Sequence, residues 1–128
     1  MSPPTSTTPA DPELDQLVRD IIGRVADKWT MIVLERLAEH GRLRFTRLGE
    51  LVEGVSQKML TKTLRQMEAD GLVLRTVHPV VPPRVDYELT ERGATLGAAF
   101  CGVWLWAEQH QAAITASRLA FQARADAD

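Results

Sequence analysis

The chain has 128 residues, of which 45% are hydrophobic and 25% charged, and its net charge is −2. This composition is typical of one globular domain, and no apolar run is long enough for a transmembrane helix. The N-terminus lacks the apolar core of a secretory signal, and a single cysteine, Cys101, excludes an internal disulfide. We therefore expect a cytoplasmic protein with one domain.

Two amphipathic helices are expected after a disordered tail. Residues 1–12 are rich in Pro, Ser and Thr, so little there offsets the entropy of ordering, and the domain should span 13–128. Asp11 or a neighbour is expected to cap the first helix, with Pro12 at its first position. Apolar residues then recur at helical spacing, at Leu14, Leu17, Val18, Ile21, Ile22 and Val25. A second helix is expected from about Asp27 to Gly41.

A short helix and a longer one are expected next. Thr46 is a candidate N-cap for the short helix, and Gly54 should end it. Ser56 is a candidate N-cap for the longer helix, which should stop at Gly71. The tight turn between these helices gives helix-turn-helix order, with the longer helix as the recognition element.

After Gly71 the sequence pattern changes from one typical of helices to one typical of strands. Residues 72–78 are rich in β-branched side chains, and residues 85–89 alternate, with Asp86 and Glu88 on the face opposite to Val85, Tyr87 and Leu89. A long helix should follow Thr90. The expected fold class is mainly α (α+β): a winged helix-turn-helix with a two-stranded β wing and a long C-terminal dimerisation helix.

The recognition helix has a polar face, and no acid occurs from Gly54 to Met67. Leu60, Leu64 and Met67 share the core face, and Lys58, Lys62, Arg65 and Ala69 lie opposite, flanked by Gln57, Thr61 and Gln66. Cations with amide and hydroxyl groups suit phosphates and base edges in a major groove. The alternative is an ordinary solvated face, although such faces usually mix both signs of charge.

The stretch HPVVPPRVDYEL, His78–Leu89, is expected to form the wing. Its prolines stiffen the tip, and Arg84 would be presented there to phosphate or to a narrow groove. Arg44 and Arg47 could add phosphate contacts or be plain surface charges. The candidate DNA contacts are Arg44, Thr46, Arg47, Ser56, Gln57, Lys58, Thr61, Lys62, Arg65 and Arg84.

The sequence resembles the HxlR-type winged helix-turn-helix transcriptional regulators of the MarR-like group. The matching segments are residues 27–37, residues 42–93 and the Trp-containing helix after them, with motifs such as GVSQKMLT and VPPRVDYELTERG. The resemblance implies a homodimeric regulator that binds palindromic operators, with DNA contacts on the recognition helix and the wing. Some members sense oxidants through a cysteine near the N-terminus. Because this chain has Gln16 or a neighbour there, we do not expect thiol sensing at that position.

The resemblance also implies dimerisation through the first and last helices. The apolar surface of the last helix is broader than one small core can cover, whereas a two-fold partner could cover it. The candidate dimerisation residues are Leu14, Leu17, Ile21, Leu96, Phe100, Val103, Trp104 and Ala107. A rival interpretation is that its aromatic residues line a pocket for a small-molecule effector. Cys101 is expected to be a buried small apolar residue rather than a sensor.

The sequence gives no sign of catalysis. No Cys/His/carboxylate group has metal-ligand spacing, and there is neither a phosphate loop nor a nucleophile elbow. We expect no metal, no cofactor and no enzyme activity. The expected function is a transcriptional regulator, more plausibly a repressor, because repression needs only occupancy of an operator. The alternative is a winged-helix module that binds protein and not DNA.

Overall fold

The computed structural model describes residues 11–127, so nearly all of the expected tail at residues 1–12 lies outside them. Helix α1 (Pro12–Val25) begins as the sequence predicts. The carboxylate of Asp11 accepts a hydrogen bond from the backbone N–H of Leu14 at 3.0 Å, and Pro12 needs no partner in the first turn. The predicted cap is therefore confirmed, and the helix starts one residue earlier than the expected domain boundary.

The next two long helices also start and stop at their predicted signals. Helix α2 (Lys28–His40) follows Asp27 and ends at Gly41, whose φ of 76° is a left-handed conformation that favours glycine. Helix α4 (Gln57–Ala69) is capped by Ser56, whose hydroxyl oxygen accepts a hydrogen bond from the backbone N–H of Met59 at 3.1 Å. These local signals place both helices correctly.

The short helix begins earlier than the sequence suggests. Helix α3 spans Phe45–Leu51, and its N-cap is Arg44 rather than Thr46, which lies within the first turn. The reason is a strand that the sequence analysis missed. Strand β1 (Leu43–Arg44) pairs with a later strand, and the chain passes directly from this pairing into α3. The prediction that Thr46 caps the helix was wrong.

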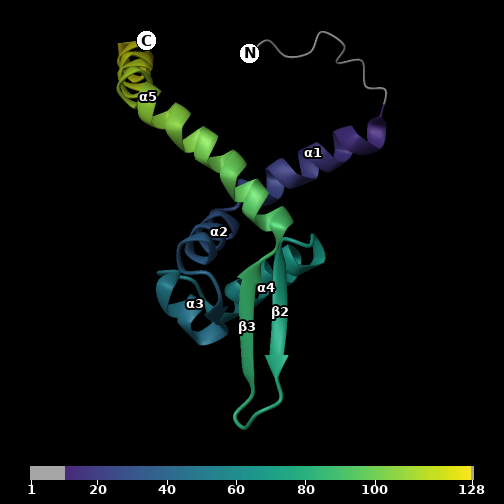
Figure 1. Cartoon of the computed structure of the whole chain (residues 1–128). Coiled ribbons are helices and arrows are strands. Elements are labelled where there is room, and N and C mark those ends of the chain that lie inside the picture. Colours follow the sequence, from purple (N-terminus) through teal and green to yellow (C-terminus); the bar gives the residue numbers. More distant parts are fainter. Residues whose placement is uncertain (1–10, 128) are drawn as a thin grey trace.

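The three strands form one antiparallel sheet in the order β1-β3-β2. Strands β2 (Val73–His78) and β3 (Arg84–Leu89) form the hairpin of the wing, with Val73 opposite Leu89 at its base and His78 opposite Arg84 at its outer end. Figure 1 shows this hairpin projecting from the helical body. The expected winged helix-turn-helix is confirmed, with a third short strand added to the predicted two.

The core lies between α2, α3, α4 and the sheet. The predicted inner face of α4 is confirmed, because Leu60, Leu64 and Met67 are each about 1% exposed. Burial of each such side chain contributes roughly 1.5–3 kcal/mol. The other fully buried apolar side chains come from α2 and from α3 with its C-cap: Val33, Leu37, Leu48 and Val52. The recognition helix is thus held on its apolar face and open on the other.

Helix α5 (Glu91–Ala127) is tied to this core at its first turn. The hydroxyl of Thr90 donates to the carbonyl of Gly71 and accepts from the N–H of Gly93. A Cβ on Gly93 would lie 2.1 Å from the carbonyl oxygen of Leu72, so only glycine permits this approach. The start of α5 is therefore fixed against the end of α4.

The rest of α5 leaves the body. Its 37 residues extend about 55 Å, and Figure 1 shows α5 and α1 diverging on the side of the body opposite to the wing. Gly93 is the buried residue of this helix, so most of its apolar surface is uncovered in one chain. Within residues 11–127 no helix is sufficiently long and apolar to span a membrane.

Candidate nucleic-acid interface

Helix α4 presents its polar face to the outside. Gln57, Lys58, Thr61, Lys62 and Arg65 are all exposed. None of the three cations forms an ion pair with another residue of the range 11–127. Their charges are therefore not neutralised by the part of the chain that the structure describes. This is the face that the sequence analysis assigned to DNA.

A groove runs between α4 and the wing. Its volume is about 770 Å³, and its walls bring together residues from β1, α3, α4, β2 and β3. Six predicted DNA-contact residues line it: Arg44, Thr46, Gln57, Thr61, Arg65 and Arg84. The acid among its lining residues is Glu68, so arginines dominate the charge of this groove. The fold thus gathers side chains that are up to 40 positions apart in the sequence.

Arg75 also lines this groove, and the sequence analysis missed it. It lies in β2 directly opposite Tyr87, on the sheet face that turns toward α4. It is exposed and forms no ion pair with any residue between 11 and 127. Its signal was available, because a cation between Val73 and Val77 interrupts an apolar strand face.

The remaining predicted contacts do not line the groove. Lys58 and Lys62 lie on the outer ridge of α4, and Lys62 faces a second hollow shared with α1 residues. Arg47 pairs with Glu50 on its own helix at 3.3 Å. The hydroxyl oxygen of Ser56 is engaged in capping α4. Arg47 and Ser56 therefore have local structural roles that the sequence analysis weighed only in part.

Arg84 is not at the wing tip as expected. It is the first residue of β3, and its guanidinium turns back to the carboxylate of Asp86, with Nε 3.1 Å from Oδ1 and Nη2 3.2 Å from Oδ2. The tip itself consists of residues 79–83, where Val81 is fully exposed. The cation that was predicted at the tip instead forms an ion pair at the outer end of the β2–β3 hairpin, because a buried acid lies two residues away.

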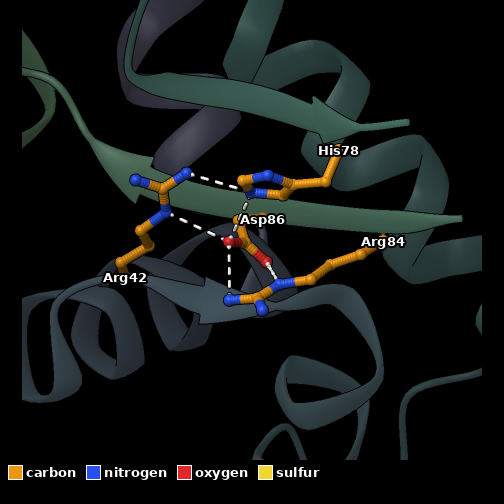
Figure 2. A network of polar contacts seen from close by, with 4 residues as sticks. All are labelled: Arg42, His78, Arg84 and Asp86. Carbon is orange, nitrogen blue, oxygen red and sulfur yellow. Dashed lines mark hydrogen bonds and ion pairs between the residues drawn. The ribbon is translucent and has the colours of Figure 1, made fainter. Parts of the chain in front are cut away.

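Asp86 is the centre of a polar cluster, shown in Figure 2. The residue is 2% exposed, although the alternating pattern placed it on the face opposite to the apolar Val85, Tyr87 and Leu89. Besides Arg84, Oδ2 accepts a hydrogen bond from Nε of Arg42 at 3.1 Å and lies 3.0 Å from Nε2 of His78. Hydrogen bonds from Arg84 lower the pKa of Asp86 to about 2, helped by His78 and Arg42 and opposed by burial. The carboxylate therefore remains ionised near neutral pH.

The comparisons with known proteins agree with this geometry. The profile of the HxlR-like helix-turn-helix family matches residues 24–115, more than two thirds of the chain. The chain belongs to this family. It is 35% identical over 100 residues to YtfH of Escherichia coli, an uncharacterised HTH-type transcriptional regulator, which covers 78% of this chain and 79% of that protein.

Two further matches extend the HxlR-family comparison. A regulator of the same type from Methanothermobacter thermautotrophicus is 43% identical over 75 residues, 59% of this chain and about half (56%) of that protein. The crystal structure of a MarR-family transcriptional regulator from Enterococcus faecalis superposes with a TM-score of 0.71 at 29% identity, covering 87% of this chain and 98% of that one. The chain is thus an HTH-type transcriptional regulator with a MarR-like fold, and its relatives are named as regulators rather than enzymes.

The candidate dimerisation residues of this HxlR-family chain fall into two groups. Leu96 and Phe100 are half-buried, because they pack against their own core from α5. The exposed group combines α1 with α5: Leu14, Leu17, Val103, Trp104 and Ala107. Ile21 is intermediate. These apolar side chains are uncovered in a single chain, on two helices that diverge from the body.

Cys101 is exposed in the single chain, whereas the sequence analysis expected a buried small apolar residue. It borders an apolar hollow of about 630 Å³ between α2, β3 and α5, with Phe100 and Leu34 among the other lining residues. Burial within one chain fails because α5 touches the core only through its first turns. Within residues 11–127 no group of three or more His, Cys, Asp or Glu residues is arranged to hold a metal ion.

Proposed function

We propose that the chain is a homodimeric, sequence-specific DNA-binding regulator that represses transcription from a palindromic operator. The observation that carries the proposal is the groove between α4 and the wing, where four arginines face one glutamate. Neutralisation of phosphates supplies much of the affinity for DNA. The net charge of the chain, −2, does not favour DNA binding. The local excess of cations in this groove does favour it, because the groove would attract the phosphates of the DNA backbone.

Helix α4 would enter the major groove. An α-helix with its side chains is about 10–12 Å wide, which matches a major groove about 12 Å wide. Gln57 and Thr61 carry the amide and hydroxyl groups that read base edges, and they lie near the N-terminal end of α4. Lys58 and Lys62 on the outer ridge would contact phosphates beside them.

The groove beside α4 would hold one strand of the DNA backbone. Arg44, Arg65 and Arg75 reach it from three different elements and have no ion-pair partner within residues 11–127. The hydroxyl of Thr46, which lies in the first turn of α3, adds a neutral donor on the same wall. Contacts of this kind fix the orientation of the protein and carry little sequence information themselves.

A second copy of the chain would cover the apolar surface of α1 and α5. Trp104 is 65% exposed in one chain, and Leu17 is 54% exposed. Patches of large apolar side chains on a soluble chain mark interaction surfaces. A two-fold dimer would place two copies of α4 about 34–36 Å apart, one turn of DNA, so the operator would be an inverted repeat.

Repression requires only that the bound dimer occupies a promoter, and this is the reason for preferring it to activation. A small-molecule effector, if the cell supplies one, would bind in the apolar hollow between α2, β3 and α5. Such a ligand would lie between the dimerisation helix and the wing. The DNA target and the single cysteine fit a reducing, cytoplasmic location.

The proposal is tested by binding of duplex DNA at a series of salt concentrations. Log affinity should fall steeply with log salt, and Lys62→Ala should weaken binding to all sequences about equally. Gln57→Ala and Thr61→Ala should instead change the preference among sequences. A chain that binds no duplex even at low salt, or binds every sequence equally, would favour the alternative of a protein-binding module.

A further inference from the structure

The carboxylate of Asp86 lies at the junction of three segments of the chain. Arg42 comes from the turn between α2 and β1, His78 from the outer end of β2, and Arg84 from the start of β3. Figure 2 shows their three side chains converging on this one acid. Because it joins the wing to the end of α2, the cluster fixes the outer part of the hairpin relative to the body.

Arg84 is held by two parallel hydrogen bonds. Its Nε and Nη2 donate to the two carboxylate oxygens at 3.1 and 3.2 Å, the bidentate geometry that fixes the plane of a guanidinium. The Arg84 side chain is still 42% exposed and lines the groove beside α4. Nη1 and one N–H of Nη2 are therefore left to contact a ligand in that groove.

We propose that Asp86 is a positioning residue for DNA binding: its buried carboxylate orients the Arg84 guanidinium so that the free N–H groups of Arg84 contact the DNA backbone. This inference rests on the proposed function. Asp86 is shared between Arg84 and Arg42, so the cluster keeps a net positive charge, and what Asp86 adds at Arg84 is a fixed direction for its hydrogen bonds. Arg42 and His78 also contact Oδ2 and so help to hold the carboxylate in place.

If Asp86 acted through its charge alone, its removal would have the opposite effect on DNA affinity. Removing an acid from the wing would strengthen attraction to DNA through the general electrostatic field. If Asp86 acts by orienting Arg84, its removal weakens binding although the wing becomes more positive. The sign of the change in affinity therefore separates positioning from simple charge.

The experiment measures dissociation constants of the full-length chain for its selected duplex at one salt concentration. Asp86→Asn, which keeps the shape and removes the charge, is expected to weaken binding roughly tenfold, as for loss of a charge-assisted hydrogen bond. Glu88→Gln is the matched control, because it removes an acid from the same strand outside the groove and outside the Asp86 cluster. It should leave affinity unchanged or slightly raised.

Two further variants connect the effect to Arg84. Arg84→Lys keeps the charge but lacks the planar fork, and it leaves Asp86 with Arg42 and His78, so it tests orientation even if Asp86→Asn folds poorly. It should lose affinity about as Asp86→Asn does. In the Arg84→Ala background, Asp86→Asn should cause no further loss, because the group that it orients is absent.

Three results would overturn the inference: wild-type or tighter binding by Asp86→Asn, wild-type binding by Arg84→Lys, or additive losses in the double variant. A wild-type chain that binds no duplex would instead refute the proposed function, and this inference with it. Binding by the wild type with no loss in these variants would refute only the role of Asp86.

Discussion

Arg75 gives a direct test of the groove between α4 and the wing. Five cations of each protomer face the proposed DNA surface without an ion-pair partner within residues 11–127: Arg44, Lys58, Lys62, Arg65 and Arg75. A dimer would thus neutralise ten phosphates, which gives a slope of log affinity against log salt of roughly −9. Arg84 is left out of this count because it forms an ion pair with Asp86.

Arg75→Ala removes two of these ten contacts from the dimer. The slope should become shallower, to about −7, and the loss of affinity between 50 and 200 mM salt should be roughly tenfold smaller than for the wild type. Fluorescence anisotropy with a labelled operator at five or more salt concentrations measures the slope. Arg124→Ala, at the far end of α5, is the control and should keep the wild-type slope.

An unchanged slope for Arg75→Ala would refute the assignment of this groove to the DNA backbone. The conclusion would be stronger if Lys62→Ala made the slope shallower in the same assay. DNA would then lie along the outer ridge of α4 and bypass the space between α4 and the wing.

Further predictions concern stability and assembly. Gly93→Ala should destabilise the fold by about 1–3 kcal/mol in urea unfolding, because its Cβ would meet the carbonyl of Leu72. Gly97→Ala is the control and should be neutral or stabilising, because a Cβ there has nothing within 4 Å. Equal effects of the two substitutions would argue against the close approach of Gly93 to Leu72. The lowered pKa of Asp86 means that its contribution to stability is present above about pH 4 and lost as pH falls toward 2. Acid unfolding of Asp86→Asn should lack this part of the pH dependence, and an unchanged profile would contradict it. Trp104→Glu should shift a dimer toward monomer in sedimentation velocity at micromolar concentration, and an unaltered dimer would place the interface elsewhere.

Local sequence signals predicted most of the helical frame. Ser56 caps α4 with its own hydroxyl, and Gly41 and Gly71 adopt the positive φ that ends a helix. These features depend on residues within a few positions of one another. The apolar spacing of α4 likewise fixed which of its faces is buried, and hence which face is free to contact a ligand.

Features that depend on distant residues were not predicted. Strand β1 has two residues, too few for a periodic pattern, and exists because Leu43 pairs with Tyr87 across 44 positions. The burial of Asp86 was not predicted, because the alternating pattern contains no information about which cations the fold will gather around it. Arg42, His78 and Arg84 compensate for the burial of its carboxylate. Because this contact of Arg84 was not foreseen, the sequence analysis placed Arg84 at the tip.

The exposed apolar side chains of α5, from which we propose a dimer, were predicted in part. The sequence indicated that α5 is too apolar for one chain, and the exposure of Val103 and Trp104 agrees with this. It did not distinguish them from Leu96 and Phe100, which pack on the core of their own chain. That distinction depends on where α5 leaves the body, which is set by the contact of Gly93 with Leu72.

The central claim is that two copies of α4 read a palindromic operator, and selection of bound sequences from a random duplex pool tests it most directly. Full-length protein should enrich an inverted repeat whose half-sites are centred about one helical turn apart, 34–36 Å. Enrichment of no sequence would contradict DNA recognition by this surface. Enrichment of a single site without symmetry would contradict the dimer.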